Sequence, residues 1–197
     1  MKNKEIQEKR MKGYFIQATK EILKGEGIQS LSVRNIANRA GYSYATLYNY
    51  FKDVNELLFY CIQDFQEECQ QFVEKNTSKK TKGIEHLSAT VLAYIHYFME
   101  YPGIFDLFYI VKMDGIHTKA SIITIINASL ENVCKLDWDY CESKNIINKD
   151  EIESLKAQLK YTTIGLLVFY LNRTEPVTYL EFIEKSKTQI NNILNLK

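Results

Sequence analysis

The side chains best suited to recognising another molecule lie between residues 43 and 52. Thr46 offers a methyl group that can contact thymine, and Asn49 offers an amide that can form two hydrogen bonds with adenine. Hydroxyl and cationic side chains nearby can bind phosphate. The candidate DNA contacts are Ser32, Arg34, Ser43, Tyr44, Thr46, Tyr48, Asn49, Tyr50 and Lys52.

Two short helices must position these side chains, and the first is predicted to follow Ser32. The Ser32 hydroxyl can cap that helix, and Gly41 suits its end because glycine adopts the left-handed conformation without strain. The apolar residues between them recur at helical spacing and form one face: Val33, Ile36, Ala37 and Ala40.

The second helix is predicted to begin at Tyr44, after the cap residue Ser43. Leu47 and Phe51 are four residues apart and can pack against the first helix. A helix, a tight turn and a short helix over about 32–51 form the layout of a helix-turn-helix. Such a motif places its second helix in the major groove of DNA.

The candidate DNA contacts divide by expected role. Four residues of the second helix are expected near bases or backbone: Thr46, Tyr48, Asn49 and Tyr50. Four others are expected to hold phosphates and fix the register: Ser32, Arg34, Ser43 and Lys52. Tyr44 could stack on a sugar or bond a phosphate. For any one of these residues, the alternative is an exposed and inert side chain.

Residues 31–58 resemble the DNA-binding domain of the TetR-type bacterial transcriptional regulators. The matching residues are Ile36-Ala37, Ala40-Gly41, Ser43, Thr46-Leu47-Tyr48, Tyr50-Phe51-Lys52 and Glu56-Leu57. Two positions differ from the pattern of many relatives. Tyr44 and Ala45 stand where a basic residue and a glycine are usual, and Val54 stands where a lysine commonly contacts phosphate.

Charge is unevenly distributed along the chain. Residues 1–52 hold ten Lys and Arg against four Glu, a net charge of +6, whereas the whole chain carries only +1. A basic segment on a slightly acidic remainder suits one surface that meets phosphate. The alternative is a lysine-rich terminus that is merely solvated.

Enzymatic and metal chemistry have little support in the sequence. The three histidines, His86, His96 and His117, are scattered, and no nucleophile motif or phosphate-binding glycine loop accompanies them. The four cysteines lack the spacing of a zinc site or a disulfide framework. No signal peptide or membrane span is evident. We therefore expect a cytoplasmic protein with no metal, no cofactor and no membrane partner.

The remaining chain predicts an all-α protein of about nine helices. Asp53 can cap the helix after the motif, and Glu56 completes a capping box. Helices are expected over residues 4–25, 53–75, 84–100, 104–113, 118–135, 149–172 and 177–196, with a connection over 136–148. Residues 1–60 are expected to form the DNA-binding domain, and residues 61–197 a helical domain for effector binding and dimerisation.

The last two expected helices carry apolar stripes that must be buried. Their candidate dimer contacts are Leu155, Leu159, Leu166, Leu180, Ile183, Ile190 and Leu194. Packing within one chain is the alternative. The resemblance favours a homodimer, because relatives pair these two helices with their symmetry mates. A two-fold dimer would also set two recognition helices about 34 Å apart on one side of a duplex.

The middle of the chain is rich in aromatic residues. The candidate effector pocket consists of Tyr94, Phe98, Phe105, Phe108, Tyr109, Trp138, Tyr161 and Phe169. Aromatic residues at helical spacing more often form plain core. The resemblance favours a pocket, because relatives commonly hold a small molecule between these helices, with polar tips orienting it.

The sequence thus predicts a DNA-binding transcriptional regulator. The resemblance implies a repressor that binds a palindromic operator as a dimer and is released by a small lipophilic or aromatic effector. An effector-independent structural or scaffolding DNA-binding protein of the same fold is the alternative. A helical enzyme is the least supported class.

Overall fold

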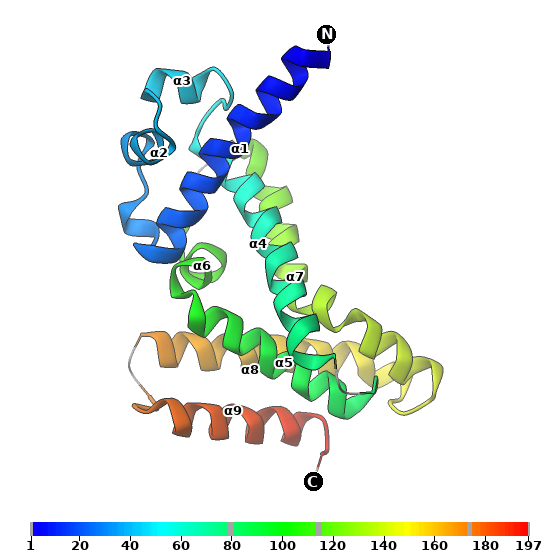
Figure 1. Ribbon diagram of the computed structural model, residues 1–197. Helices are drawn as coiled ribbons and strands as arrows, with labels where there is room; N and C mark the ends of the chain where they lie inside the picture. The colour runs from blue at the N-terminus through cyan, green and yellow to red at the C-terminus, as the bar shows by residue number, and fades with distance from the viewer. Residues whose placement is uncertain (1, 79–80, 113–115, 173–174, 197) are drawn as a thin grey trace. The chain divides into compact units, whose positions relative to one another are not determined.

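The computed structural model describes residues 2–78, 81–112, 116–172 and 175–196 (Figure 1). These ranges contain nine α-helices and no strand, which confirms the all-α prediction. The elements are α1 Lys2–Gly25, the 3-10 turn η1 Ile28–Ser30, α2 Val33–Ala40, α3 Tyr44–Tyr48, α4 Val54–Thr77, α5 Ile84–Glu100, α6 Pro102–Phe105, the π-helical turn η2 Asp106–Ile110, α7 Ile116–Ser143, α8 Lys149–Leu171 and α9 Tyr179–Ile193.

The chain forms two compact units that interleave along the sequence. Unit 1 comprises residues 1–67 and 101–127, and unit 2 comprises residues 68–100 and 128–197. The expected division at residue 60 therefore differs from the observed one in two respects. Unit 1 takes a little more of α4, and it also includes α6, η2 and the first part of α7.

A close backbone approach explains why α6 belongs to unit 1. Gly103 in α6 lies against the end of α1, where a Cβ atom on this residue would sit 2.1 Å from the Leu23 carbonyl oxygen. Any larger residue would have to push the two backbones apart. The segment after α5 therefore packs on α1 only because glycine occupies this position.

The core of unit 1 is built around α1. Phe15 is fully buried and meets the edge of Phe51 with ring centroids 6.3 Å apart. Ile36 of α2 and Leu47 of α3 are also fully buried, as the predicted apolar faces require. An ion pair between Lys20 of α1 and Asp64 of α4, with Nζ and Oδ2 3.0 Å apart, ties the two long helices together.

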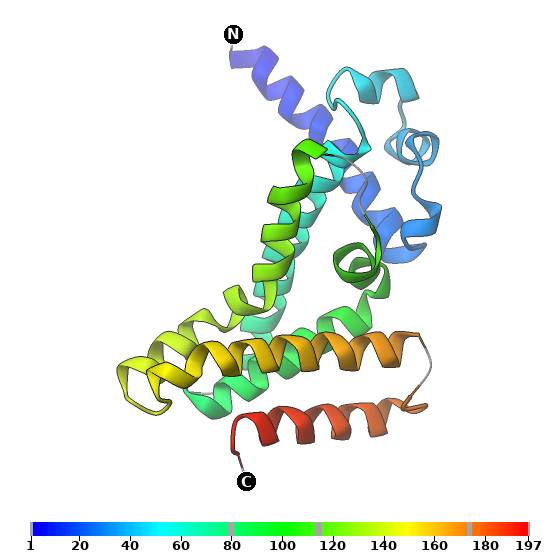
Figure 2. The same cartoon turned by 180° about the vertical axis from the view of Figure 1, so that it is seen from behind.

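The core of unit 2 is centred on α5, which packs against both α8 and α9. Helices α8 and α9 lie side by side in both views (Figure 1, Figure 2). The stacked rings of Tyr170 and Phe182, 4.1 Å apart, join them. Asn148 caps α8 and Thr178 caps α9 through their side-chain oxygens, which accept from backbone N–H groups of the first turns.

Helix α7 is longer than the sequence predicted. It continues to Ser143, whereas the expected helix ended at residue 135 and was followed by a connection. Asp137 and Trp138 lie in the added turns and are almost completely buried. Tertiary burial of these side chains stabilises the extra turns, and local propensity carries no signal of it. The expected end of the helix before α7, at Met113, lies outside the described residues.

All four cysteines are free and buried: Cys61, Cys69, Cys134 and Cys141. Burial is the main cause that raises the pKa of each thiol. In unit 1 the nearby Asp64 carboxylate raises the pKa of Cys61 further. Among the described residues, no group of three or more potential metal ligands comes together.

None of the described helices combines the length and the apolar character that crossing a membrane requires.

Candidate functional site

The helix-turn-helix of unit 1 is held by local hydrogen bonds at each helix end. The Asn35 backbone N–H donates to Ser32 Oγ at 3.1 Å, which caps α2. Gly41 ends α2 in the left-handed conformation with φ of 78°. The Thr46 backbone N–H donates to Ser43 Oγ at 3.2 Å, which caps α3. These bonds fix α3 immediately after a tight turn, as the cap residues predicted.

The start of α4 is fixed by a reciprocal pair of bonds. The Glu56 backbone N–H donates to Asp53 Oδ1 at 2.8 Å, and the Lys52 backbone N–H donates to Glu56 Oε2 at 2.7 Å. The capping box is therefore present, but Glu56 reaches one residue further back than the Asp53 N–H that the usual pattern engages. This bond holds the exposed Lys52 at the junction between α3 and α4.

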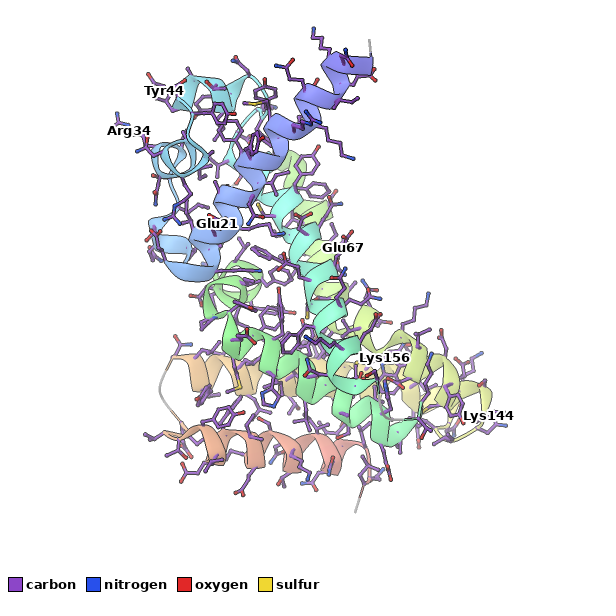
Figure 3. All side chains as sticks on the ribbon, viewed as in Figure 1. Glu21, Arg34, Tyr44, Glu67, Lys144 and Lys156 are labelled. Carbon is purple, nitrogen blue, oxygen red and sulfur yellow. The ribbon has the colours of Figure 1, made fainter. Side chains whose placement is uncertain are left out.

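Helix α3 buries one residue, half-buries Thr46 and presents the others outward. Leu47 is fully buried, whereas Tyr44 is 59% exposed and Tyr48 is 52% exposed. Ala45 and Asn49 are also exposed. Figure 3 shows Tyr44 and Arg34 pointing outward from α3 and α2. The structure thus places most of the predicted DNA contacts on an accessible surface.

Tyr50 is placed differently from its neighbours on α3. It is half-buried, with its ring 6.3 Å from that of Phe15. Tyr42 also packs on Phe15, at 5.7 Å, and stacks on Tyr14 at 6.0 Å. These contacts give Tyr50 and Tyr42 a structural role in holding α3 on α1, beside any contact with DNA.

Cations are sparse on the helix-turn-helix. Arg39 forms an ion pair with Glu26, which leaves Arg34 and Lys52 as the exposed basic residues between positions 33 and 52 that pair with no described side chain. Both are among the predicted phosphate contacts. The surface therefore combines a small positive charge with hydroxyl and amide groups.

Unit 2 holds an open groove of about 670 Å³. Its volume lies within the range of small-molecule sites, roughly 300–1,000 Å³. Its lining residues are Phe72, Asn76, Ala89, Leu92, Ala93, His96, Met99, Glu100, Tyr170 and Tyr179. Most are apolar or aromatic, with polar groups on α4 and α5. Burial lowers the pKa of His96.

None of the eight predicted pocket residues lines this groove. In unit 2, Tyr94 and Phe98 are buried core, and the Tyr94 hydroxyl donates to Ser129 Oγ at 3.1 Å. Tyr161 and Phe169 are 69% and 61% exposed on α8. In unit 1, Phe105 and Phe108 are buried and Tyr109 is half-buried. The prediction shares only α5 and α8 with the groove, whose other lining residues lie on α4 and α9, and on α5 it named the buried face.

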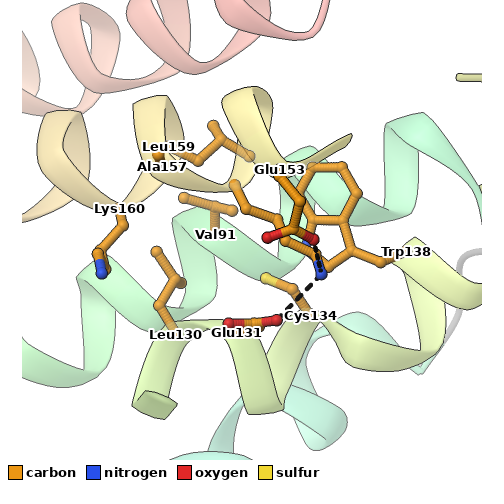
Figure 4. Close-up of a pocket in the computed structure, with 10 residues that line it drawn as sticks. Val91, Leu130, Glu131, Cys134, Trp138, Glu153, Ala157, Leu159 and Lys160 are labelled. Atoms are coloured by element: carbon orange, nitrogen blue, oxygen red, sulfur yellow. Dashed lines mark hydrogen bonds and ion pairs between the residues drawn. The ribbon is translucent and has the colours of Figure 1, made fainter. Parts of the chain in front are cut away.

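The eighth predicted pocket residue, Trp138, lines a small cavity of about 120 Å³ in unit 2 (Figure 4). At its edge, the Lys156 ammonium lies 3.0 Å from Glu131 and 2.9 Å from Glu153. Burial alone would lower the pKa of Lys156, but hydrogen bonds to these carboxylates outweigh it and raise the pKa. The cavity is too small for most organic effectors.

The seven predicted dimer contacts differ in exposure. Leu159, Ile190 and Leu194 are buried within the protomer, so intrachain packing accounts for them. The remaining four are exposed or half-exposed: Leu155, Leu166, Leu180 and Ile183. Further exposed apolar residues lie on or beside the same two helices: Tyr161, Phe169, Val177 and Tyr179. Helices α8 and α9 thus keep apolar surface that the described chain does not cover.

A buried polar cluster in unit 2 was not predicted from the sequence. His86 Nδ1 lies 2.8 Å from Asp137 Oδ2, and the Thr90 hydroxyl donates to the same oxygen at 3.3 Å. The Gly83 backbone N–H donates to Asp137 Oδ1 at 3.4 Å. A buried carboxylate needs such partners. The sequence shows only that His86 and Thr90 lie one helical turn apart. Asp137 is 51 positions from His86 and 47 from Thr90, so no local pattern connects it to them.

Comparison with known protein families gives the observation that decides the assignment. Residues 15–61 match the model of the bacterial regulatory proteins of the tetR family. The chain carries a TetR-family DNA-binding domain. The match covers the helix-turn-helix and the helices that hold it, and it confirms the resemblance that the sequence suggested. No curated protein matches the chain.

Several solved structures share the fold over most of the chain. The Bacillus subtilis transcriptional regulator FadR in complex with stearoyl-CoA is 14% identical, with a TM-score of 0.71 over 92% of this chain and 96% of that one. RolR in complex with resorcinol is 13% identical, with a TM-score of 0.70 over 96% of this chain and 88% of that one. A TetR family transcription regulator from Marinobacter aquaeolei is 20% identical, with a TM-score of 0.59 over 98% of both chains. These likenesses show a shared fold, and together with the domain match they support a DNA-binding transcription regulator.

Proposed function

We propose that this TetR-family protein is a repressor that binds a palindromic operator as a homodimer and is released by a small lipophilic or aromatic effector. It would act in the bacterial cytoplasm, where the chromosome lies, and without enzymatic activity. The observation that carries the proposal is the exposed face of α3 within a matched TetR-type domain.

The exposed apolar surface of α8 and α9 supports the dimer. Leu180, Val177 and Phe169 are all exposed in the single chain, and burying apolar surface stabilises association. A two-fold axis between such helices makes each surface its own partner. It would also present two copies of α3 to two half-sites, about one helical turn apart.

The groove in unit 2 supports an effector. Its walls are mainly apolar, and the lowered pKa of His96 keeps this side chain uncharged at neutral pH. An aromatic or aliphatic effector would bury its body against Phe72 and Met99. The solved relatives bind ligands of both kinds, since FadR holds stearoyl-CoA and RolR holds resorcinol.

Helix α4 offers a direct route from effector to DNA. It is continuous from Val54, immediately after the helix-turn-helix, to Thr77, and it contributes Phe72 and Asn76 to the groove. An effector that displaces the end of α4 would change the position of α3 relative to the other protomer's α3. A complete switch requires a differential affinity of about 5.5 kcal/mol between the two states. DNA must then weaken effector binding by the same factor.

The test is fluorescence anisotropy of the purified protein on the DNA upstream of its own gene, with scrambled duplex as control, at two salt concentrations. Specific binding that survives the higher salt would support the regulator. Equal and steeply salt-sensitive binding to both duplexes would indicate phosphate contacts alone and would contradict it.

The effector is tested on the same complex with resorcinol and with a long-chain acyl-CoA as probes. Release by either probe should disappear in an Ala89→Trp variant, which fills the groove, and persist in Gln71→Trp, an exposed site on α4 outside it. Specific DNA binding that no lipophilic or aromatic compound releases would favour the scaffolding alternative.

A further inference from the structure

The outward face of α3 has two rows of side chains, each spaced by one helical turn. Tyr44 and Tyr48 are four residues apart and form the first row, and Ala45 and Asn49 form the second. Residues at this spacing are neighbours on a helix surface. All four side chains are exposed. Helix α3 carries no lysine or arginine, so it lacks the side chains that most often read guanine, through its O6 and N7 atoms.

The second row suits A·T base pairs. A small methyl side chain such as that of Ala45 can contact the C5 methyl group of thymine, and an asparagine amide can pair with N6 and N7 of adenine. The Asn49 side chain forms no hydrogen bond with the described residues, so its amide is available for such a contact.

Thr46 contributes a further methyl group. Its hydroxyl is hydrogen-bonded to the Ser43 hydroxyl at 2.9 Å, and Ser43 Oγ also accepts from the Thr46 backbone N–H. The cap of α3 therefore engages the hydroxyl of Thr46. The methyl group of this half-exposed side chain takes no part in the cap and is available for contact with a base.

The two tyrosines of the first row supply amphipathic contacts, and these give guanine no preference over the other bases. Within the described residues, the rings of Tyr44 and Tyr48 contact no other ring and their hydroxyls bond no side chain. A tyrosine can lay its apolar ring against a sugar or a thymine methyl while its hydroxyl bonds a phosphate. Ring contacts hold Tyr42 and Tyr50 against Phe15 instead.

We propose that the base pairs in contact with α3 are A·T pairs, with Ala45 and Thr46 reading thymine methyl groups and Asn49 reading adenine. This inference rests on the proposed function, in which α3 lies in the major groove of an operator. It names the base composition of the centre of each half-site. Arg34, which lies at the start of α2, is expected to contact phosphate, so it adds no base preference to the half-site.

The experiment begins with selection from a randomised duplex pool by the full-length protein, followed by base-analogue substitution in the selected site. Replacing thymine by uracil removes only the C5 methyl group, and replacing adenine by 7-deazaadenine removes only the N7 acceptor. Loss of one buried methyl contact should weaken binding about fourfold. The complete asparagine–adenine pair contributes about 5- to 150-fold, and removing the N7 acceptor should cost part of that factor because the bond to N6 remains.

Two variants connect each effect to its residue. Asn49→Ala should bind weakly and become insensitive to 7-deazaadenine. Ala45→Gly should become insensitive to uracil at one position. Because glycine also weakens a helix, Ala45→Ser serves as a second variant, and the melting temperature of each is compared with the parent.

The possible results distinguish a failure of the A·T inference from a failure of the proposed function. A·T pairs at the half-site centre, with analogue effects that disappear in the matching variants, are the expected outcome. Selected sites with G·C pairs that respond to Asn49→Ala, or binding unaffected by uracil and 7-deazaadenine, would overturn the inference and leave the regulator intact. A pool with no enriched sequence would overturn the proposed function and this inference with it.

Discussion

Two pairs of tyrosines, one pair in each unit, serve opposite purposes. In unit 2, Tyr94 and Tyr97 are 0% and 2% exposed, whereas in unit 1 Tyr44 and Tyr48 are 59% and 52% exposed. The buried pair have partners for ring and hydroxyl, since the Tyr94 hydroxyl donates to Ser129 and the Tyr97 ring meets that of Phe72 at 5.6 Å. The same residue type therefore builds core at one pair of positions and offers contact groups at the other.

The comparison also shows what separates stability from recognition in this chain. A fully buried aromatic ring contributes several kcal/mol to folding, because its removal leaves a cavity. An exposed ring contributes little to folding and retains its surface for a partner. Three predictions test this distinction and a fourth concerns the groove of unit 2, in order from the largest expected effect to the smallest.

The largest effect is expected for Tyr97→Ala in unit 2. Removing this buried ring should lower the free energy of unfolding by about 3–5 kcal/mol, through lost burial and the cavity left behind. Urea unfolding at one fixed protein concentration measures it. Tyr48→Ala is the matched control and should cost less than about 0.5 kcal/mol. Equal losses in the two variants would abolish the contrast between the units.

Tyr48→Ala has the smaller effect on stability of the two variants, but it should have the larger effect on DNA binding. We expect operator affinity to fall by roughly 5- to 150-fold, the equivalent of one good contact, while the melting temperature stays unchanged. Fluorescence anisotropy gives the affinity. Leu136→Ala, an exposed position on α7, should leave it unaltered. Full-strength binding by Tyr48→Ala would remove this residue from the DNA interface.

The hydroxyl groups alone should show a smaller version of the contrast. Tyr94→Phe removes the donor to the buried Ser129, which should cost about 1–2 kcal/mol of folding free energy. Tyr44→Phe removes an exposed hydroxyl and should leave folding unchanged. Paired urea titrations of the two variants provide the measurement, and a stable Tyr94→Phe protein would show that Ser129 finds another partner.

The smallest effect concerns pH. Burial lowers the pKa of His96 in the folded chain, so the unfolded chain binds more protons once the pH falls below the ordinary value of about 6.5. The contribution of neutral His96 to stability is therefore complete above that pH and is lost as the pH falls through it. The difference between wild-type and His96→Gln stability curves from pH 5 to 8 isolates this group from the other histidines. A constant difference would contradict the shift.

The local part of the site was predictable because its determinants are close in sequence. Ser32, Ser43 and Asp53 each precede the helix they cap, and the structure confirms all three caps. The hidden face of α3 followed from the spacing of Leu47 and Phe51. Short-range hydrogen bonds and a helical period need no knowledge of the tertiary fold.

The remaining features depend on contacts between distant segments. The approach of Gly103 to the Leu23 carbonyl, which assigns α6 to unit 1, joins positions 80 residues apart. The bond between His86 and Asp137 spans 51 positions. Which face of α5 borders the groove depends on how α4, α8 and α9 pack around it, and the helical period of α5 alone carries no record of those partners.

The burial of all four thiols makes the protein a favourable subject for site-specific labelling. Thiol reagents attack the thiolate, and burial both shields Cys61, Cys69, Cys134 and Cys141 and raises their pKa values. A single cysteine introduced at an exposed position such as Glu21, which lies on α1 (Figure 3), would therefore react far ahead of the native ones. A maleimide dye at position 21 would report on the DNA-binding unit. The core would keep its native cysteines, which need not be replaced first.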